Sequence, residues 1–196
     1  MRFVKCLLTP TIVALTVPVA QASTITFIHS GIAHGGTVDG AAFDPGEFTI
    51  TAVADTDDLK VYLDVYFINH LSATIEIEGV GVVTLLTPTR TFSADDIDTV
   101  GFARATRSGM DLFDGPTDPA FDGYDLTTAI VPITGTGVIL QWAAPDVLTD
   151  HGVLVFDNLD ETSATFRAVV PLPGALPLLA GGLALVGVVR RRRRAA

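Results

Sequence analysis

Hydrophobic and polar residues alternate with a period of two along much of the central chain. Residues 60–68, KVYLDVYFI, place four apolar side chains on one face of an extended segment: Val61, Leu63, Val65 and Phe67. Residues 73–79, ATIEIEG, show the same alternation, with Ile75 and Ile77 on one face and Glu76 and Glu78 on the other. A period of two is typical of a half-buried β-strand.

Further short apolar segments are punctuated by Gly, Pro, Asp or Asn, as strands joined by turns would be. They lie at 24–28, 35–43, 47–54, 80–86, 89–94, 99–104, 137–142, 152–156 and 164–170. Only residues 95–99 and 124–130 suggest a helical turn. About a dozen strands without intervening helices predict an all-β domain over residues 23–169, an antiparallel β-sandwich.

The first 22 residues have the pattern of a secretory signal peptide. Arg2 and Lys5 precede an uncharged, mostly apolar stretch, and Ala20 and Ala22 are the small residues that signal peptidase reads before a cut. We therefore predict cleavage between Ala22 and Ser23. An N-terminal membrane anchor is the alternative, but the apolar run falls short of the roughly 20 residues that span a bilayer.

The chain ends in a second apolar stretch followed by arginines. Residues 168–189 carry no charge, which is long enough for a helix to cross a ~30 Å hydrocarbon core. The cluster after it would stay in the cytoplasm and stop transfer: Arg190, Arg191, Arg192, Arg193 and Arg194. A permanent anchor would need no more, yet Pro171, Pro173 and Pro177 keep the backbone extended, as a processing enzyme requires.

This tail, residues 170–196, resembles the PEP-CTERM sorting signal: a proline motif at 170–174, a transmembrane helix at about 175–189 and the arginines at 190–194. The motif is similar to the VPLPA-type variant, with Leu172 in place of the family's Glu and glycine in place of the final Ala: Val170, Pro171, Leu172, Pro173 and Gly174. The resemblance implies transient insertion in the inner membrane and processing by an exosortase-like membrane transpeptidase. It also implies delivery to the cell surface or the exopolysaccharide matrix.

The body resembles exported bacterial proteins of unknown function that carry the same tail. The similarity lies in the segments HLSATIEIEGVG, LLTPTRTF and GTGVILQW, at 70–81, 85–92 and 135–142. These segments have the pattern of strands and turns, so this resemblance implies no activity.

Charge is concentrated in the body. All 22 acidic side chains lie between Asp39 and Glu161, where only five cationic ones oppose them: Lys60, Arg90, Arg104, Arg107 and Arg167. Such a surface repels polyanions, which excludes nucleic acid as a partner. The lone cysteine, Cys6, lies in the signal peptide, so the mature chain has no disulfide and no thiol nucleophile.

The sequence carries no familiar catalytic motif. G-x-S-x-G and H-E-x-x-H are absent, and the histidines are scattered at His29, His34, His70 and His151. We expect His29 and His34 to be exposed loop residues rather than metal ligands, and Trp142 to be a buried packing anchor rather than a platform for sugar stacking. Paired carboxylates for glycoside hydrolysis have no recognisable context, so an enzyme is not indicated.

Acidic loops offer one candidate metal site. Residues 111–125, DLFDGPTDPAFDGYD, interleave five carboxylates with Gly and Pro: Asp111, Asp114, Asp118, Asp122 and Asp125. Calcium takes six to eight oxygen ligands, which such a loop could supply, although the spacing is not that of an EF-hand. The alternative is that these are solvated turn residues, since Asp favours turns. No other cofactor is expected.

Two classes of function remain. The first, which we favour at this point, is a non-catalytic structural or adhesive protein of the cell surface or exopolysaccharide matrix. The second is a carbohydrate-binding or hydrolytic domain that uses the same export route. An open groove lined by aromatic rings and paired carboxylates would favour the second class.

Overall fold

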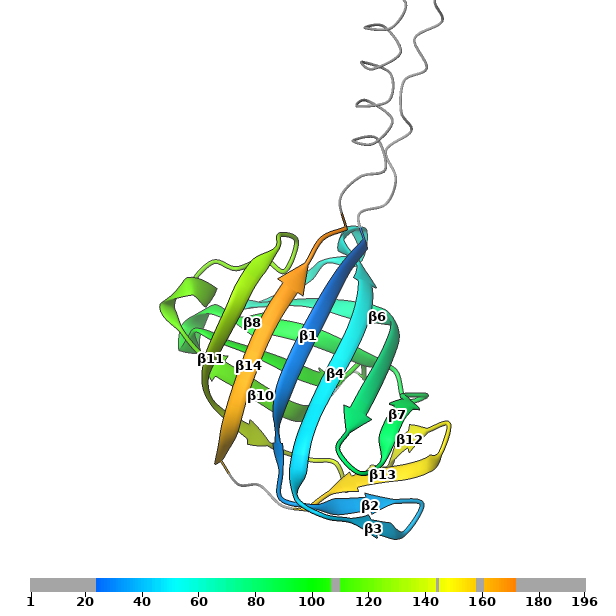
Figure 1. Ribbon diagram of the computed structural model, residues 1–196. Helices are drawn as coiled ribbons and strands as arrows, with labels where there is room; N and C mark the ends of the chain where they lie inside the picture. The colour runs from blue at the N-terminus through cyan, green and yellow to red at the C-terminus, as the bar shows by residue number, and fades with distance from the viewer. Residues whose placement is uncertain (1–23, 107–109, 144, 158–160, 172–196) are drawn as a thin grey trace, which may run out of the picture. The chain divides into compact units, whose positions relative to one another are not determined.

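The computed structural model describes residues 24–106, 110–143, 145–157 and 161–171, which belong to one of two compact units of the chain, Ala22–Leu172. The predicted signal-peptide cleavage site and most of the predicted tail lie outside these residues. Throughout the part that is described, strands hydrogen-bond to antiparallel neighbours (Figure 1). The prediction of an all-β, antiparallel fold is therefore confirmed.

The larger sheet closes on itself. Within the described residues, eight strands form an antiparallel barrel in the order β4, β1, β14, β11, β10, β9, β8 and β6, and β6 pairs again with β4. Their bounds are β1 Thr24–Ala33, β4 Gly46–Asp55, β6 Val65–Ile77, β8 Thr89–Ala94, β9 Thr99–Arg104, β10 Asp111–Thr117, β11 Ile130–Ile139 and β14 Glu161–Val169.

Closure depends on β6, which has different neighbours along its length. Its residues 65–69 pair with β8, and its residues 70–77 pair with β4 across a register shift between Val53 and Ala54. Such an irregularity increases local bend and twist, which lets one strand join both sides of a sheet. The predicted sandwich of two stacked sheets is thus not what the described residues show. In a closed barrel, each long strand has a hydrogen-bonded neighbour on both edges. The alternation of apolar and polar residues along one strand cannot reveal this arrangement.

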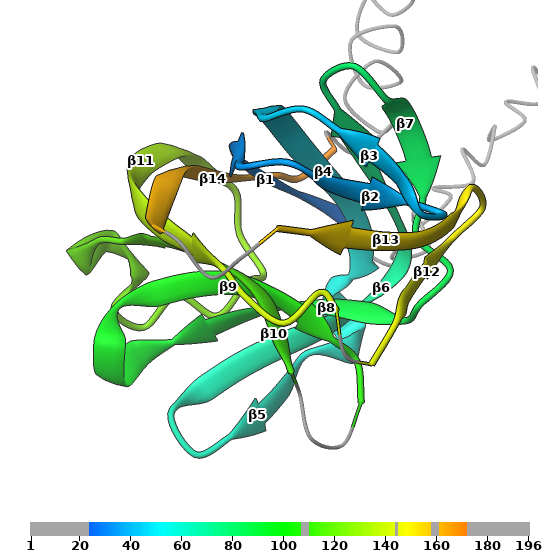
Figure 2. The same ribbon diagram turned by 90° about the horizontal axis from the view of Figure 1, so that it is seen from below.

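A second sheet of four short strands covers one end of the barrel (Figure 2). Its strands are β12 Val147–Thr149, β13 Gly152–Phe156, β2 Gly36–Val38 and β3 Ala41–Phe43. Phe156 from this sheet lies 5.2 Å, centroid to centroid, from Phe48 of the barrel and 4.7 Å from Trp142. Trp142 is 1% exposed, so its prediction as a buried packing anchor is confirmed.

Residues 60–68, which the alternation treats as one strand, form a hairpin instead. β5 (Lys60–Tyr62) pairs back onto the start of β6, and Leu63 occupies the turn with φ of 52°. Val61 and Leu63 are therefore exposed rather than sharing a buried face with Val65. Gly and Asn are the residues that usually mark a tight hairpin turn, and this turn has neither. The alternation of apolar and polar residues continues across the turn, so the sequence does not reveal the hairpin. β7 (Gly81–Thr84) pairs with the other end of β6, where Ile75 and Ile77 are buried as predicted.

Three single-turn 3-10 helices connect the strands: η1 Thr56–Asp58, η2 Asp95–Ile97 and η3 Pro119–Phe121. The helical turn expected within 95–99 is confirmed by η2, whereas the one expected within 124–130 is wrong. Tyr124 instead packs near Phe121 and donates a hydrogen bond from its hydroxyl to the carbonyl of Thr128. In the part of the chain that is described, no helix has the length and apolarity to cross a membrane.

Candidate functional site

The start of the predicted sorting motif directly follows β14. Val170 is partly buried against a core cluster that includes Phe27 and Phe166, whereas Pro171 is exposed and outside any helix or strand. The body therefore ends where the motif begins, and Pro171 is accessible. The remaining predicted processing and membrane residues lie outside the described part: Ala20, Ala22, Ser23, Leu172, Pro173, Gly174, Arg190, Arg191, Arg192, Arg193 and Arg194.

The five aspartates of the candidate calcium loop are distributed over a strand, a 3-10 turn and the loop after it. Asp118 caps η3 by accepting a hydrogen bond from the Ala120 amide at 2.8 Å, and Asp125 accepts from the amide and hydroxyl of Thr127. Asp122 is exposed directly after η3. Among the described residues, no group of three or more His, Cys, Asp or Glu is placed to hold a metal ion.

Asp111 and Asp114 lie apart from that loop, on β10. The segment 111–117, predicted as part of a loop, is a strand. A bulge between Asp111 and Phe113 allows both Leu112 and Phe113 to be buried. In a regular strand, residues three apart point to opposite faces. The bulge places Asp111 and Asp114 on the same outer face of the barrel, where both line one groove.

This groove has a volume of about 900 Å³ and is formed by β5, β6, β8, β10 and η2. On β8, Thr91 points into the barrel toward His29, so the alternate residues Arg90, Phe92 and Ala94 point outward into the groove. Ligand sites in proteins typically have volumes of about 300–1,000 Å³. The groove is therefore large enough for a small-molecule or oligomeric ligand.

Strand register sets the order of the groove residues. One row crosses the sheet as Lys60, Phe67, Phe92, Gly101 and Asp114. The next row is Asn69, Arg90, Ala103 and Asp111. Gly101 and Ala103 leave space on β9, and a Cβ at position 101 would lie 2.3 Å from the Phe92 ring. The Phe92 ring thus lies over β9 and forms an apolar floor.

The rim of the groove is exposed and partly aromatic. Tyr62 on β5 is 70% exposed and Ile97 at the end of η2 is 56% exposed, whereas Phe92 is only 9% exposed. Tyr62 is the aromatic side chain of this groove that an incoming ligand can reach most easily.

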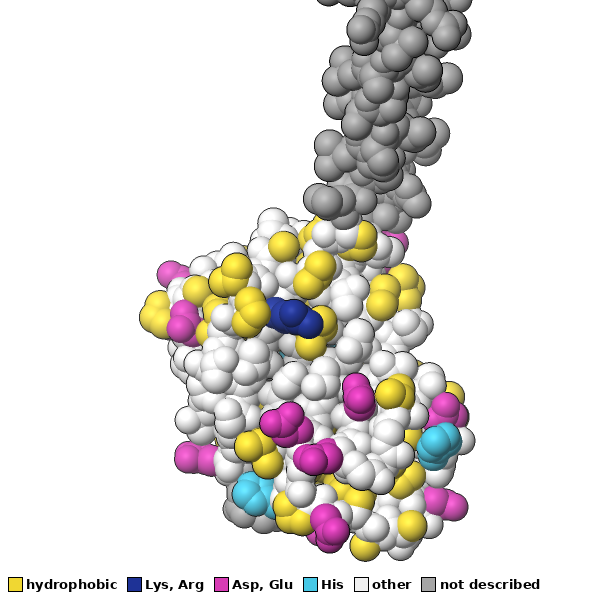
Figure 3. Space-filling view, in the orientation of Figure 1, with side chains coloured by type: hydrophobic (Ala, Val, Ile, Leu, Met, Phe, Trp, Pro, Cys, Tyr) yellow, Lys and Arg dark blue, Asp and Glu magenta, His cyan; other side chains and the backbone are white. Residues whose placement is uncertain are grey.

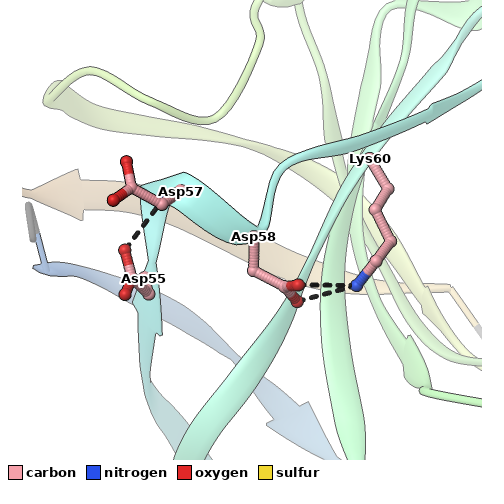
Figure 4. Close-up of polar contacts among 4 residues, drawn as sticks. All are labelled: Asp55, Asp57, Asp58 and Lys60. Carbon is pink, nitrogen blue, oxygen red and sulfur yellow. Dashed lines mark hydrogen bonds and ion pairs between the residues drawn. The ribbon is translucent and has the colours of Figure 1, made fainter.

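One arginine and one lysine bring positive charge to the groove. Arg90 lies over the ring of Phe67, with 4.6 Å between the guanidinium carbon and the ring centroid. Burial lowers the pKa of Arg90, and the charge of Asp111 opposes that shift. Lys60 donates to both carboxylate oxygens of Asp58 at 2.8 Å, next to Asp55, which accepts from the Asp57 amide (Figure 4).

Two carboxyl groups line the same groove from β10. Burial raises the pKa of Asp111, and the positive charge of Arg90 partly offsets the effect. Burial, together with the charge of Asp111, raises the pKa of Asp114 to about 6. The Oδ1 atom of Asp114 and the Nε atom of Arg90 are buried and have no hydrogen-bond partner in the described part of the chain.

The outer face of β11, β14, β1 and β4 differs from the groove (Figure 3). Most of its surface is uncharged, and many of its acidic side chains lie over the half next to the small sheet. Its hydroxyl groups bond to one another: Ser30 to Thr49 at 3.2 Å, and Thr134 to Thr165 at 2.9 Å. The groove, with buried polar atoms that lack partners, is the better candidate for ligand binding.

Two histidines lie inside the barrel rather than in loops. His29 is fully buried on β1, so our expectation that it is an exposed loop residue is wrong, whereas His34 is exposed. His70 hydrogen-bonds to the hydroxyls of Thr89 and Thr91, and its ring stacks on Phe102. Burial lowers the pKa of His29 and His70 to about 3, so both are neutral core residues.

Sequence reasoning missed the groove because its residues come from five separate elements. The pairing of β9 with both β8 and β10, which aligns Arg90 with Asp111, has no signal in any one segment. No family model, no curated protein and no solved structure matches this chain.

Proposed function

We propose that this protein is an exported carbohydrate-binding protein whose ligand site is the groove between β5 and β10. The observation that carries the proposal is the combination of an open groove of about 900 Å³, an exposed Tyr62 and the paired carboxylates of Asp111 and Asp114. A groove of this kind favours the carbohydrate-binding class over a purely structural role.

The chemistry of the groove suits a sugar chain. A sugar ring has an apolar face of C–H groups, which packs on aromatic and aliphatic side chains such as Tyr62 and Ile97. Its edge carries hydroxyls, which donate to the carboxylates of Asp111 and Asp114 and accept from the guanidinium of Arg90. The groove thus offers carboxylate acceptors on β10 and a guanidinium donor on β8, with Arg90 and Asp111 in one row.

Export completes the proposal. The signal peptide carries the body across the inner membrane, and the PEP-CTERM-like tail is processed by an exosortase-like transpeptidase. β1 begins at Thr24, two residues after Ala22, and pairs antiparallel with β14, so the start and end of the body lie at the same end of neighbouring strands. That arrangement supports processing at both ends without disturbing the barrel. Delivery to the cell surface or matrix places the groove among exopolysaccharides.

Binding of the purified protein to the producing organism's own exopolysaccharide tests the proposal. Tyr62→Ala should weaken binding by about tenfold, because loss of an aromatic contact of ~1.4 kcal/mol corresponds to that factor. Val131→Ala is a matched control, because Val131 is 74% exposed on β11 and outside the groove. No binding by the wild type, or equal affinity for the wild type and Tyr62→Ala, would contradict the proposal.

A further inference from the structure

The two carboxylates of the groove differ in how their charge is compensated. Asp111 shares a row with Arg90, separated from it by Ala103 on β9. Asp114 shares a row with Gly101 and Phe92, which contribute no charge. The positive charge of Arg90 therefore favours the ionised form of Asp111.

The other cation of the groove cannot compensate Asp114. Lys60 lies in the same row, but on β5, with β6, β8 and β9 between it and Asp114. Its ammonium group is already paired with Asp58 at 2.8 Å. Among the described residues, this is the one ion pair closer than 4.0 Å, so Asp114 has none.

Asp114 also has an unused hydrogen-bond acceptor. Its Oδ1 is buried without a partner in the described residues, although it belongs to a side chain that lines the groove. A buried acceptor without a donor costs free energy, which a ligand donor would recover once the carboxyl group turns this oxygen toward the groove. A positively charged donor would supply the missing hydrogen bond and the missing countercharge together.

We propose that the groove selects carbohydrate carrying a protonated amine, that is, an amino sugar without N-acetylation, and that Asp114 is the residue that binds the amine. This inference rests on the proposed carbohydrate-binding function and names its substrate class. The amine would lie at the β10 end of the groove, and the sugar chain would extend over Phe92 toward Tyr62.

The charge balance of the groove supports a cationic ligand. Among the described residues that line it, the charged side chains are Lys60 on β5, Arg90 on β8, Asp96 on η2, and Asp111 and Asp114 on β10. With all of these described side chains ionised, carboxylates outnumber cations, and Lys60 is already paired with Asp58. Burial first, and the charge of Asp111 second, raise the pKa of Asp114, and its position in the groove offers no cation to offset them. The acidic body as a whole would also attract a cationic glycan.

The test compares three tetrasaccharides with the purified full chain by calorimetric titration at pH 7, above the pKa of about 6 of Asp114. They are a tetramer of glucosamine, its fully N-acetylated counterpart and a β-1,4-linked glucose tetramer. The glucosamine tetramer should bind about tenfold more tightly than the other two, as expected for one charge-assisted hydrogen bond of ~1.4 kcal/mol. Asp114→Asn, which keeps the size of the side chain, should remove that preference.

A second variant controls for general attraction to an acidic protein. Asp39→Asn removes one charge at an exposed position, and Asn tolerates the positive φ of 49° found there. This variant should keep the full preference for the amine. Equal affinities of the wild type for the three tetramers would overturn the inference, as would an Asp114→Asn variant that keeps the preference.

Tyr62→Ala separates failure of this inference from failure of the proposed function. If all three tetramers bind equally and Tyr62→Ala weakens all of them, the groove binds carbohydrate without selecting an amine. If none of the tetramers binds, or if Tyr62→Ala binds them like the wild type, both proposals fail for these ligands.

Discussion

His29 and His70 share one hydrogen-bonding partner inside the barrel, the hydroxyl of Thr91, at 3.1 and 3.0 Å from their Nε2 atoms. A hydroxyl can donate one hydrogen bond and accept another, so it can serve both neutral rings at once. Burial keeps the two rings uncharged, with pKa values of about 3, and the positive charge of each would further disfavour protonation of the other.

This arrangement predicts that acid destabilises the barrel. An exposed histidine in the unfolded chain titrates near its ordinary pKa of 6.5, so between pH 6.5 and about 3 the unfolded state binds protons that the folded state does not. Stability is full above this window and falls as the pH drops into it. At about pH 5 the loss should be roughly 2 kcal/mol per histidine, measured by urea unfolding at several pH values.

Asp114 acts in the opposite direction and provides an internal check. Its pKa is raised to about 6 in the folded state, so protonation on acidification favours folding and offsets part of the histidine effect. Asp114→Asn should therefore lose more stability than the wild type between pH 7 and pH 5. A free energy of unfolding that stays constant over this range in the variant would refute the account of the two histidines.

Trp142 should contribute strongly to the stability of the fold, although it lies next to a loop. Its Nε1 donates to the Leu112 carbonyl at 2.7 Å, and its ring meets Phe156 edge to face at 4.7 Å. Trp142→Phe should lower the free energy of unfolding by about 2 kcal/mol, through a lost hydrogen bond and a small cavity. Circular dichroism is the suitable probe, because the substitution removes the lone tryptophan. Leu71→Ala, at a position that is 68% exposed, should change stability little; equal effects of the two substitutions would contradict the prediction.

The proposed sorting route predicts a trapped precursor. If Pro171 and Pro173 present an extended segment to a transpeptidase, their double substitution by Ala should leave the full-length chain in the inner membrane. A plain anchor would be unaffected, because its apolar length and arginines are intact. Pro45→Ala with Pro132→Ala is a matched control within the body. Intact mass of the wild-type protein from the cell surface or medium is the readout, and a mass that still includes residues 178–196 would show an anchor instead.

Strand positions could be predicted where one face of a strand is buried. Strands form with the predicted bounds at residues 89–94, 99–104 and 152–156. Each of these segments by itself contains apolar residues that pack in the core, so its pattern alone indicates a strand. Residues 111–117 escaped prediction, because Asp, Gly and Pro suggest a loop and the bulge that buries Leu112 and Phe113 breaks the period of two. The sequence pattern also reports only that a strand has a buried side, which is equally true in a sandwich and in a barrel.

The groove could not be predicted for a related reason. Arg90 and Asp111 belong to strands that do not pair with each other, and β9 between them contributes only the small residue Ala103 to their row. A small residue in a strand does not indicate which side chains of neighbouring strands will pack over it. Asp114 was singled out as a possible calcium ligand, but the feature that distinguishes it in the structure is a buried oxygen without a partner.

The central claim, that the groove is the carbohydrate site, is tested most directly by mapping backbone amide shifts of the ¹⁵N-labelled protein during titration with soluble fragments of the producing organism's exopolysaccharide. The account predicts that the largest changes fall on β5, the first half of β6, β8 and β10, where Tyr62, Phe92 and Asp114 lie. Changes confined to the outer face of β1, β4, β11 and β14, or no changes at saturating ligand, would contradict it.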